Sequence, residues 1–94
     1  MALFHVFLHG EHFLIHKDGA DAWMGFYKNF YVEADNADQA EQAAIRRLTG
    51  DPGFRAMVRN PPDQPPELNI EETTEIAPGH SLKDSDFVFF PEEA

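Results

Sequence analysis

Residues 3–17, LFHVFLHGEHFLIHK, contain two short runs in which apolar residues alternate with other side chains, mostly histidines. A period of two is typical of strands that bury one face. Gly10 and Glu11 separate the two runs, and glycine suits the first central position of a tight turn. The stretch therefore predicts a β-hairpin over 3–17 that turns at Gly10-Glu11.

The predicted register gives the hairpin an apolar face and a histidine face. It places His5 opposite His16 and His9 opposite His12, since a slip by one residue would mix the two sets. We expect burial of the apolar set, which comprises Phe4, Val6, Leu8, Phe13 and Ile15. The histidine face also carries two apolar residues, Phe7 and Leu14.

The next alternation predicts a strand over 25–34. Its even-numbered residues, such as Phe26 and Phe30, are the more apolar and should face the core. Its odd-numbered residues, including Tyr27 and Tyr31, should then share the histidine face. Later strands are expected over 67–77, with the even-numbered residues buried, and over 86–90.

Capping residues predict two helices between these strands. Asn36 with Gln39 fits a capping box for a helix over 37–49, and Asp51-Pro52 suits the start of a short helix over 52–58. The proline-rich residues 60–66 form a stiff connector.

The order β-β-β-α-(α)-β-β predicts a single domain, 1–94, of the α+β class. We expect an antiparallel sheet of about four or five strands with the helices on one face, a two-layer sandwich. The other face of the sheet would then be open to solvent.

Composition excludes several classes of function. The chain has 94 residues, no cysteine and a formal net charge of −10, so disulfides and cysteine-based zinc sites are impossible. Residues 61–94 hold nine acidic residues and one lysine, and this charge would repel nucleic acid. The N-terminal residues lack a signal-peptide pattern and no run is long enough to span a bilayer, so we expect a cytoplasmic protein without membrane contact.

Three segments carry a resemblance to known proteins: FHVFLHGEHFLI, GFYKNFYVEADNADQAEQAA and the late aromatic strand before Pro91-Glu92-Glu93. Together they resemble a group of small, uncharacterised bacterial proteins over most of the chain. The resemblance implies a compact bacterial domain and no site residues, because the group has no established activity. The order of elements is also similar to that of small antitoxin-like domains of the HicB type, in topology alone.

Two interpretations of the histidine face remain open. We favour protein–protein interaction, with a partner protein or a second copy of the chain, because aromatic residues on an open sheet face are typical of such contacts. The anchors would be Phe7, Leu14, Tyr27 and Tyr31. The alternative is a metal or small-ligand site on the cross-strand pairs His5/His16 and His9/His12, since imidazole binds zinc, nickel and copper.

No pattern predicts an enzyme or a cofactor. His80, Ser81 and Ser85 lie in a polar loop without the context of a nucleophile elbow, and the chain has no glycine-rich phosphate loop. We therefore predict no catalytic residue. The basic residues Arg46, Arg47, Arg55 and Arg59 are expected to pair with acidic residues of the C-terminal third.

Overall fold

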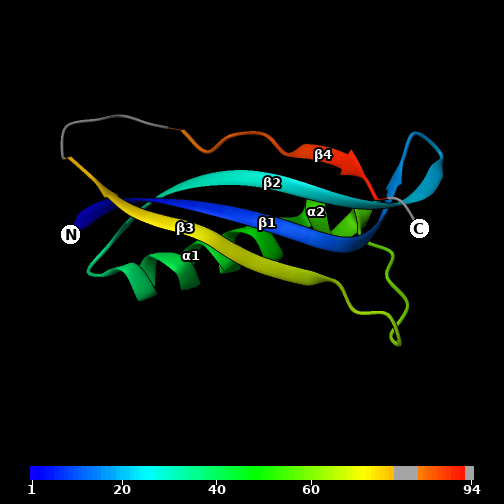
Figure 1. The fold of residues 1–94 in the computed structure, drawn as a ribbon, viewed down its shortest axis with the longest axis horizontal. Helices are drawn as coiled ribbons and strands as arrows, with labels where there is room; N and C mark the ends of the chain where they lie inside the picture. The colour runs from blue at the N-terminus through cyan, green and yellow to red at the C-terminus, as the bar shows by residue number, and fades with distance from the viewer. Residues whose placement is uncertain (78–82, 93–94) are drawn as a thin grey trace.

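The structure is a computed structural model that describes residues 1–77 and 83–92. Its elements, in order, are β1 (Ala2–Lys17), β2 (Ala20–Ala34), α1 (Ala37–Thr49), α2 (Pro52–Met57), β3 (Glu67–Ile76) and β4 (Val88–Pro91). The four strands form one antiparallel sheet in the order β3-β1-β2-β4, and both helices lie on the same side of it (Figure 1). The fold is thus of the α+β class, as predicted.

The predicted hairpin over 3–17 is wrong. These residues belong to β1, a continuous strand of 16 residues, and the chain turns at Asp18-Gly19 instead. Asp18 and Gly19 have φ angles of 54° and 81°, which are the positive values that a tight hairpin turn requires. The hairpin partner of β1 is therefore β2, and the described part of the sheet has four strands.

A β-bulge explains why the hairpin prediction still identified the buried residues. Gly10 pairs with Phe26 and Phe13 pairs with Met24, so β1 contains one residue more than β2 between these pairs. A bulge, like a two-residue turn, moves the alternation by one position. Accordingly the predicted core set is buried, with exposed fractions of 6% or less: Phe4, Val6, Leu8, Phe13 and Ile15.

Gly10 is not a turn residue. Because it has no side chain, it leaves room for an aromatic ring from the neighbouring strand. A Cβ atom on Gly10 would lie 2.2 Å from Cε2 of Phe26, which covers it from the neighbouring strand. Phe90 covers Gly25 in the same way, with its Cζ 2.3 Å from the position of a Cβ. Such cross-strand pairs of glycine and an aromatic residue let large rings lie flat on a sheet.

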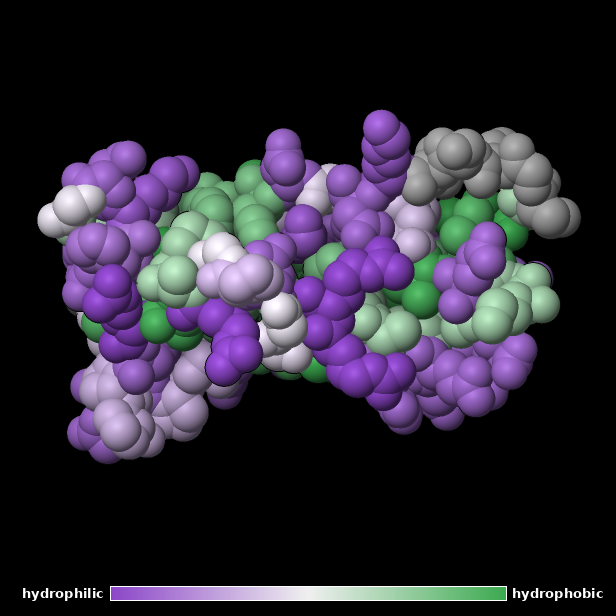
Figure 2. All heavy atoms as spheres, turned by 180° about the vertical axis from the view of Figure 1, so that it is seen from behind, coloured by the Kyte–Doolittle hydropathy of each residue, from purple (hydrophilic) through white to green (hydrophobic). Residues whose placement is uncertain are grey.

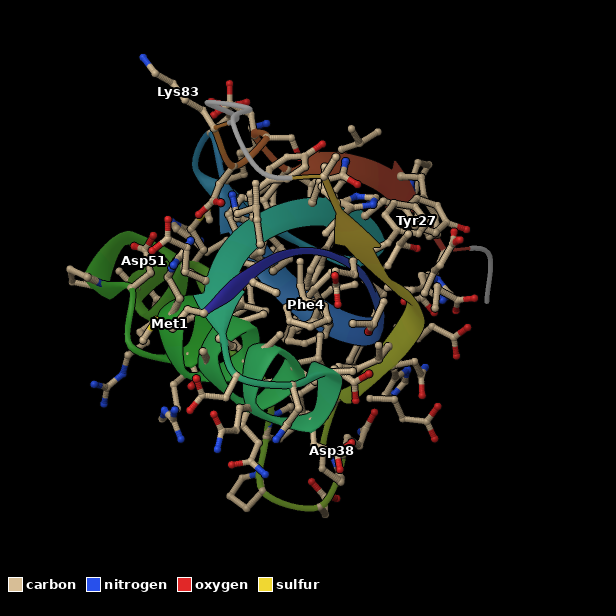
Figure 3. All side chains as sticks on the ribbon, turned by 90° about the vertical axis from the view of Figure 1, so that its left-hand side faces the viewer. Met1, Phe4, Tyr27, Asp38, Asp51 and Lys83 are labelled. Carbon is tan, nitrogen blue, oxygen red and sulfur yellow. The ribbon has the colours of Figure 1, made fainter. Side chains whose placement is uncertain are left out.

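The helices cover one face of the sheet. Asn36 caps α1 by accepting a hydrogen bond from the backbone N–H of Gln39 at 2.9 Å, as the capping box predicts. Because the buried residues Ala40 and Ala44 are small, α1 lies close to the strands. Figure 3 shows Phe4 between the sheet and the helices, while Tyr27 points away on the opposite side.

An aromatic cluster fills the core near α2. Phe54 of this helix lies 5.7 Å from Phe13 and 5.6 Å from Phe26, measured between ring centroids. Phe87 stacks on Phe54 at 5.2 Å and contacts Phe89 at 5.2 Å, which anchors the segment before β4 to the helix. None of the helices within residues 1–77 and 83–92 is long and apolar enough to cross a membrane.

The prediction that all even-numbered residues of the strand over 67–77 are buried is also wrong. Ile70 pairs with Leu8 on the core side, but the register shifts there and Glu72 pairs with Phe7 on the other face. Because of this second bulge, the even-numbered residues before it face the core, and the even-numbered residues after it, including Ile76, face the opposite surface.

Candidate functional site

The candidate site is the outer face of the sheet, defined as the surface turned away from α1 and α2. Register places His5 opposite Tyr31 and His9 opposite Tyr27, and Phe7 lies between them on β1. The odd-numbered residues of β2 therefore share this face with the histidines of β1, which confirms that part of the sequence analysis.

Six aromatic rings form a continuous row on the outer face, which we call the aromatic ladder: His5, Phe7, His9, Tyr27, Tyr31 and Phe90. The rings of Phe7 and Tyr27 are nearly parallel, with centroids 5.3 Å apart and planes at 6°. His9 stacks on the same Tyr27 at 4.7 Å, and Phe90 of β4 adds a further ring at 5.3 Å. All six residues are partly exposed.

The predicted histidine pairs do not exist. All four histidines lie on one strand, and each has its partner on a neighbouring strand instead. Nε2 of His5 lies 2.6 Å from Oδ1 of Asn29, and Nδ1 of His16 lies 2.6 Å from Oδ1 of Asp21. The pairing was wrong because it assumed a turn at Gly10, where the strand in fact continues.

Of the other two histidines, His9 lies before the bulge and His12 lies within it. Nδ1 of His9 is 3.2 Å from a carboxylate oxygen of Glu71 and 3.5 Å from one of Glu11, and its side chain is only 13% exposed. His12 stacks on Trp23 with centroids 4.3 Å apart. The metal hypothesis thus loses the pairs on which it depended, and the described residues contain no group of three or more histidine or acidic side chains that could hold a metal ion.

The predicted interaction residues fall into two groups. Phe7, Tyr27 and Tyr31 belong to the aromatic ladder, whereas Leu14 lies beyond the bulge, opposite Trp23. Trp23 also lies on this side of β2, which begins at Ala20, whereas the predicted strand begins at residue 25 and leaves Trp23 out. The alternation of Trp23 with the later odd-numbered residues of β2 was the signal that would have extended it.

β4 contributes to the outer face as well, which was not predicted from the sequence. Val88 pairs with Tyr27 and is 62% exposed, and Phe90 pairs with Gly25. The alternation of Val88 and Phe90 with Phe89 indicates two faces, but only the pairing with β2 shows which of them joins the aromatic ladder.

The segment before β4 closes the edge of β2 beside the aromatic ladder. The backbone N–H of Tyr31 donates to Oδ1 of Asp84 at 2.8 Å, and the N–H of Ser85 donates to the carbonyl of Asn29 at 3.0 Å. Arg47 binds the other carboxylate oxygen of Asp84 at 2.6 Å, which is the predicted type of pairing with a C-terminal acid. Within residues 1–77 and 83–92, the other three arginines form no such pair.

Ser85 has a structural position in this segment. Its Oγ accepts hydrogen bonds from the backbone N–H and the side-chain Nδ2 of Asn29, at 2.9 Å and 3.3 Å. The nearby His5 contacts the amide oxygen of Asn29 and not this hydroxyl. Since no base among residues 1–77 and 83–92 forms a hydrogen bond with Oγ, these contacts fasten the segment before β4 to β2. His80 and Ser81 of the predicted polar loop lie outside the described residues.

The side of the molecule that carries the helices differs from the outer face in its hydropathy. Seen from behind, hydrophilic side chains dominate and hydrophobic patches appear between them (Figure 2). A pocket of about 310 Å³ is lined by Phe13, Thr49, Phe54, Arg55 and Val58. The hydroxyl of Thr49 donates to the carbonyl of Ile45 within α1 at 2.9 Å, so among the lining side chains the guanidinium of Arg55 is the remaining hydrogen-bond donor.

Comparison of the chain with protein-family models, with curated proteins and with solved structures finds no match. The resemblance to uncharacterised bacterial proteins and the topological similarity to HicB-type domains therefore stay predictions.

Proposed function

We propose that this chain is a small acidic protein-interaction domain with a regulatory or accessory role, and that it is not an enzyme. In this proposal the fold acts as a two-layer sandwich in which the helices cover one face of the sheet and the outer face binds a partner. The partner is another protein or a second copy of the chain. A chain without cysteine needs no oxidising compartment, so we keep the cytoplasm as the proposed location.

The observation that carries the proposal is the aromatic ladder beside the exposed Val88. Tyrosine, phenylalanine and tryptophan are enriched in protein interfaces, and contiguous apolar surface on a sheet face is uncommon without a partner. The rings of the ladder are already held in place by stacking. Binding would therefore cost little side-chain entropy, which favours a contact surface of this kind.

The chemistry of the polar side chains supports a role without catalysis. On the outer face His9 is engaged by Glu71 and stacked on Tyr27, and His16 is engaged by Asp21. These groups have partners that hold them in place, as does Ser85. Within the described residues, no histidine ring forms a hydrogen bond with a hydroxyl group, so the pairing of a nucleophile with an imidazole base is not found.

A photo-crosslinking amino acid at Val88 tests the proposal in cells of the native source. We expect a crosslink to a defined protein or to a second copy, because Val88 is exposed at the edge of the aromatic ladder. The matched control places the same amino acid at Gln42, an exposed position on α1. Crosslinks that are no more frequent or specific at Val88 than at Gln42 would reject the outer face as the interaction surface.

A further inference from the structure

We propose that the partner presents a segment rich in arginine or lysine, and that the outer face binds this cationic segment in preference to a second copy of the chain. The inference rests on the proposed function and specifies the chemistry of the partner. It follows from the distribution of charge around the aromatic ladder.

Positive side chains are missing from the strand residues of the outer face. The register of the four strands puts Asp21, Glu33 and Glu72 on this face, and Glu11 and Glu71 lie beside His9. All lysines and arginines of the chain lie elsewhere: Lys17, Lys28, Lys83, Arg46, Arg47, Arg55 and Arg59. Figure 3 shows that Lys83 and Tyr27 point away from each other. Apart from the histidines, all the charged side chains that the four strands place on the outer face are therefore acidic.

The rings on the two sides of the sheet differ in their access to cations. On the core side, Nζ of Lys28 lies 4.5 Å from the centroid of Phe87 and Nζ of Lys17 lies 5.4 Å from that of Phe89. Within residues 1–77 and 83–92, no lysine or arginine lies over a ring of the aromatic ladder. The chain's own cations therefore leave the aromatic ladder free, and a cation over an aromatic face is attracted to it.

The tyrosine hydroxyls add acceptors for the same ligand. Neither the hydroxyl of Tyr27 nor that of Tyr31 forms a hydrogen bond with another described residue. A guanidinium or ammonium group has only donors, and it is satisfied by phenol and carboxylate oxygens together. Glu72, opposite Phe7, supplies a carboxylate directly beside the ladder.

Charge also disfavours the binding of a second copy of the chain to the outer face. Two outer faces related by a two-fold axis would bring one acidic set against the other, and like charges across an interface are repulsive. The net charge of −10 adds long-range repulsion between copies. The same charge attracts a cationic segment and accelerates its association.

The experiment uses the full chain and a fluorescein-labelled peptide in which arginine alternates with serine, measured by fluorescence anisotropy. Citrulline in place of arginine keeps the shape of the side chain and removes its charge, so we expect that peptide to lose binding. Amide chemical shifts should move on β1 and β2 around Phe7 and Tyr27, and those of α1 should not move. Rising salt should weaken binding.

Two matched variants distinguish binding at the outer face from nonspecific attraction by the net negative charge. Glu72→Gln removes one negative charge beside the aromatic ladder, and we expect it to raise the Kd about two- to five-fold, as for loss of one exposed charge pair. Asp63→Asn removes one charge from the exposed connector and should leave the Kd nearly unchanged. Tyr27→Ser should weaken binding further, with circular dichroism confirming that each variant is folded.

Several outcomes would overturn the inference. Equal losses in Glu72→Gln and Asp63→Asn, or equal affinity for the citrulline peptide, would show that no specific cationic site exists. A homodimer formed through Val88, or a crosslinked partner without basic segments, would also reject it while leaving the proposed function in place. Failure of both the Val88 crosslink and the peptide would reject both.

Discussion

Replacing Gly10 with alanine should destabilise the fold through a contact with a single ring. The added Cβ would lie 2.2 Å from Cε2 and 2.6 Å from Cζ of Phe26, a residue that is 0% exposed and surrounded by other aromatic rings. Such overpacking typically costs about 1–3 kcal/mol. Loss of glycine's freedom in the unfolded chain returns about 0.4–1 kcal/mol. We therefore expect a net loss of about 1–2 kcal/mol in the free energy of unfolding.

A double-mutant cycle measured by urea denaturation identifies the cause. Phe26→Leu removes the two nearest ring atoms, so in that background Gly10→Ala should cost less than half as much. Gly10 does not have a positive φ in this structure, whereas a turn at Gly10-Glu11 would require one. If Gly10 were in such a turn, alanine at position 10 would be unfavourable whatever residue stands at position 26. Equal losses in the two backgrounds would therefore refute the assignment of Gly10 as a space for Phe26.

Two further predictions concern the faces of the sheet and the bulge. Phe30→Ala, at a residue 2% exposed, should lower the free energy of unfolding by about 3–5 kcal/mol, and Tyr27→Ala should cost much less; equal losses would contradict the faces assigned to β2. Asn60→Ala removes hydrogen bonds to the backbone of Leu14 and His12 and should cost about 1–3 kcal/mol, with faster hydrogen exchange of the Leu14 amide. An unchanged exchange rate would show that Asn60 does not hold this part of β1.

Local patterns were sufficient wherever one element decides its own structure. The helix predicted over 37–49 occupies Ala37–Thr49, because Asn36 caps it and its buried alanines repeat with helical spacing. The buried residues of β1 were predicted correctly for a similar reason, since alternation reports the face of a residue directly. These predictions needed no knowledge of distant contacts.

The alternation of apolar residues shows where the buried positions shift by one residue, but it does not show which structural feature causes the shift. The step from Leu8 to Phe13 fits a two-residue turn as well as a one-residue bulge, because both move the apolar set by one position. The histidine pairs depended on that choice, so they failed although the buried set was right. The same ambiguity hid the second bulge, where Ile70 faces the core and Glu72 does not.

The bulge in β1 is specified by segments far away in the sequence. On one side Asn60 accepts a hydrogen bond from the N–H of Leu14 at 2.8 Å and donates to the carbonyl of His12 at 2.8 Å. On the other side the carboxylate of Glu92 accepts from the N–H of His12, and the N–H of Glu92 donates to the carbonyl of Trp23 at 3.0 Å.

These contacts satisfy backbone groups that the extra residue takes out of the ladder, and they hold His12 at a φ of 59°. Residues 48 and 80 positions away thus select the bulge over the turn. Because the bulge keeps β1 continuous, the strand beside His5, Phe7 and His9 is β2, and it is not formed by residues 12–16. The aromatic ladder on which the proposed interaction depends is therefore a product of long-range contacts, and the sequence around Gly10 is not enough to predict it.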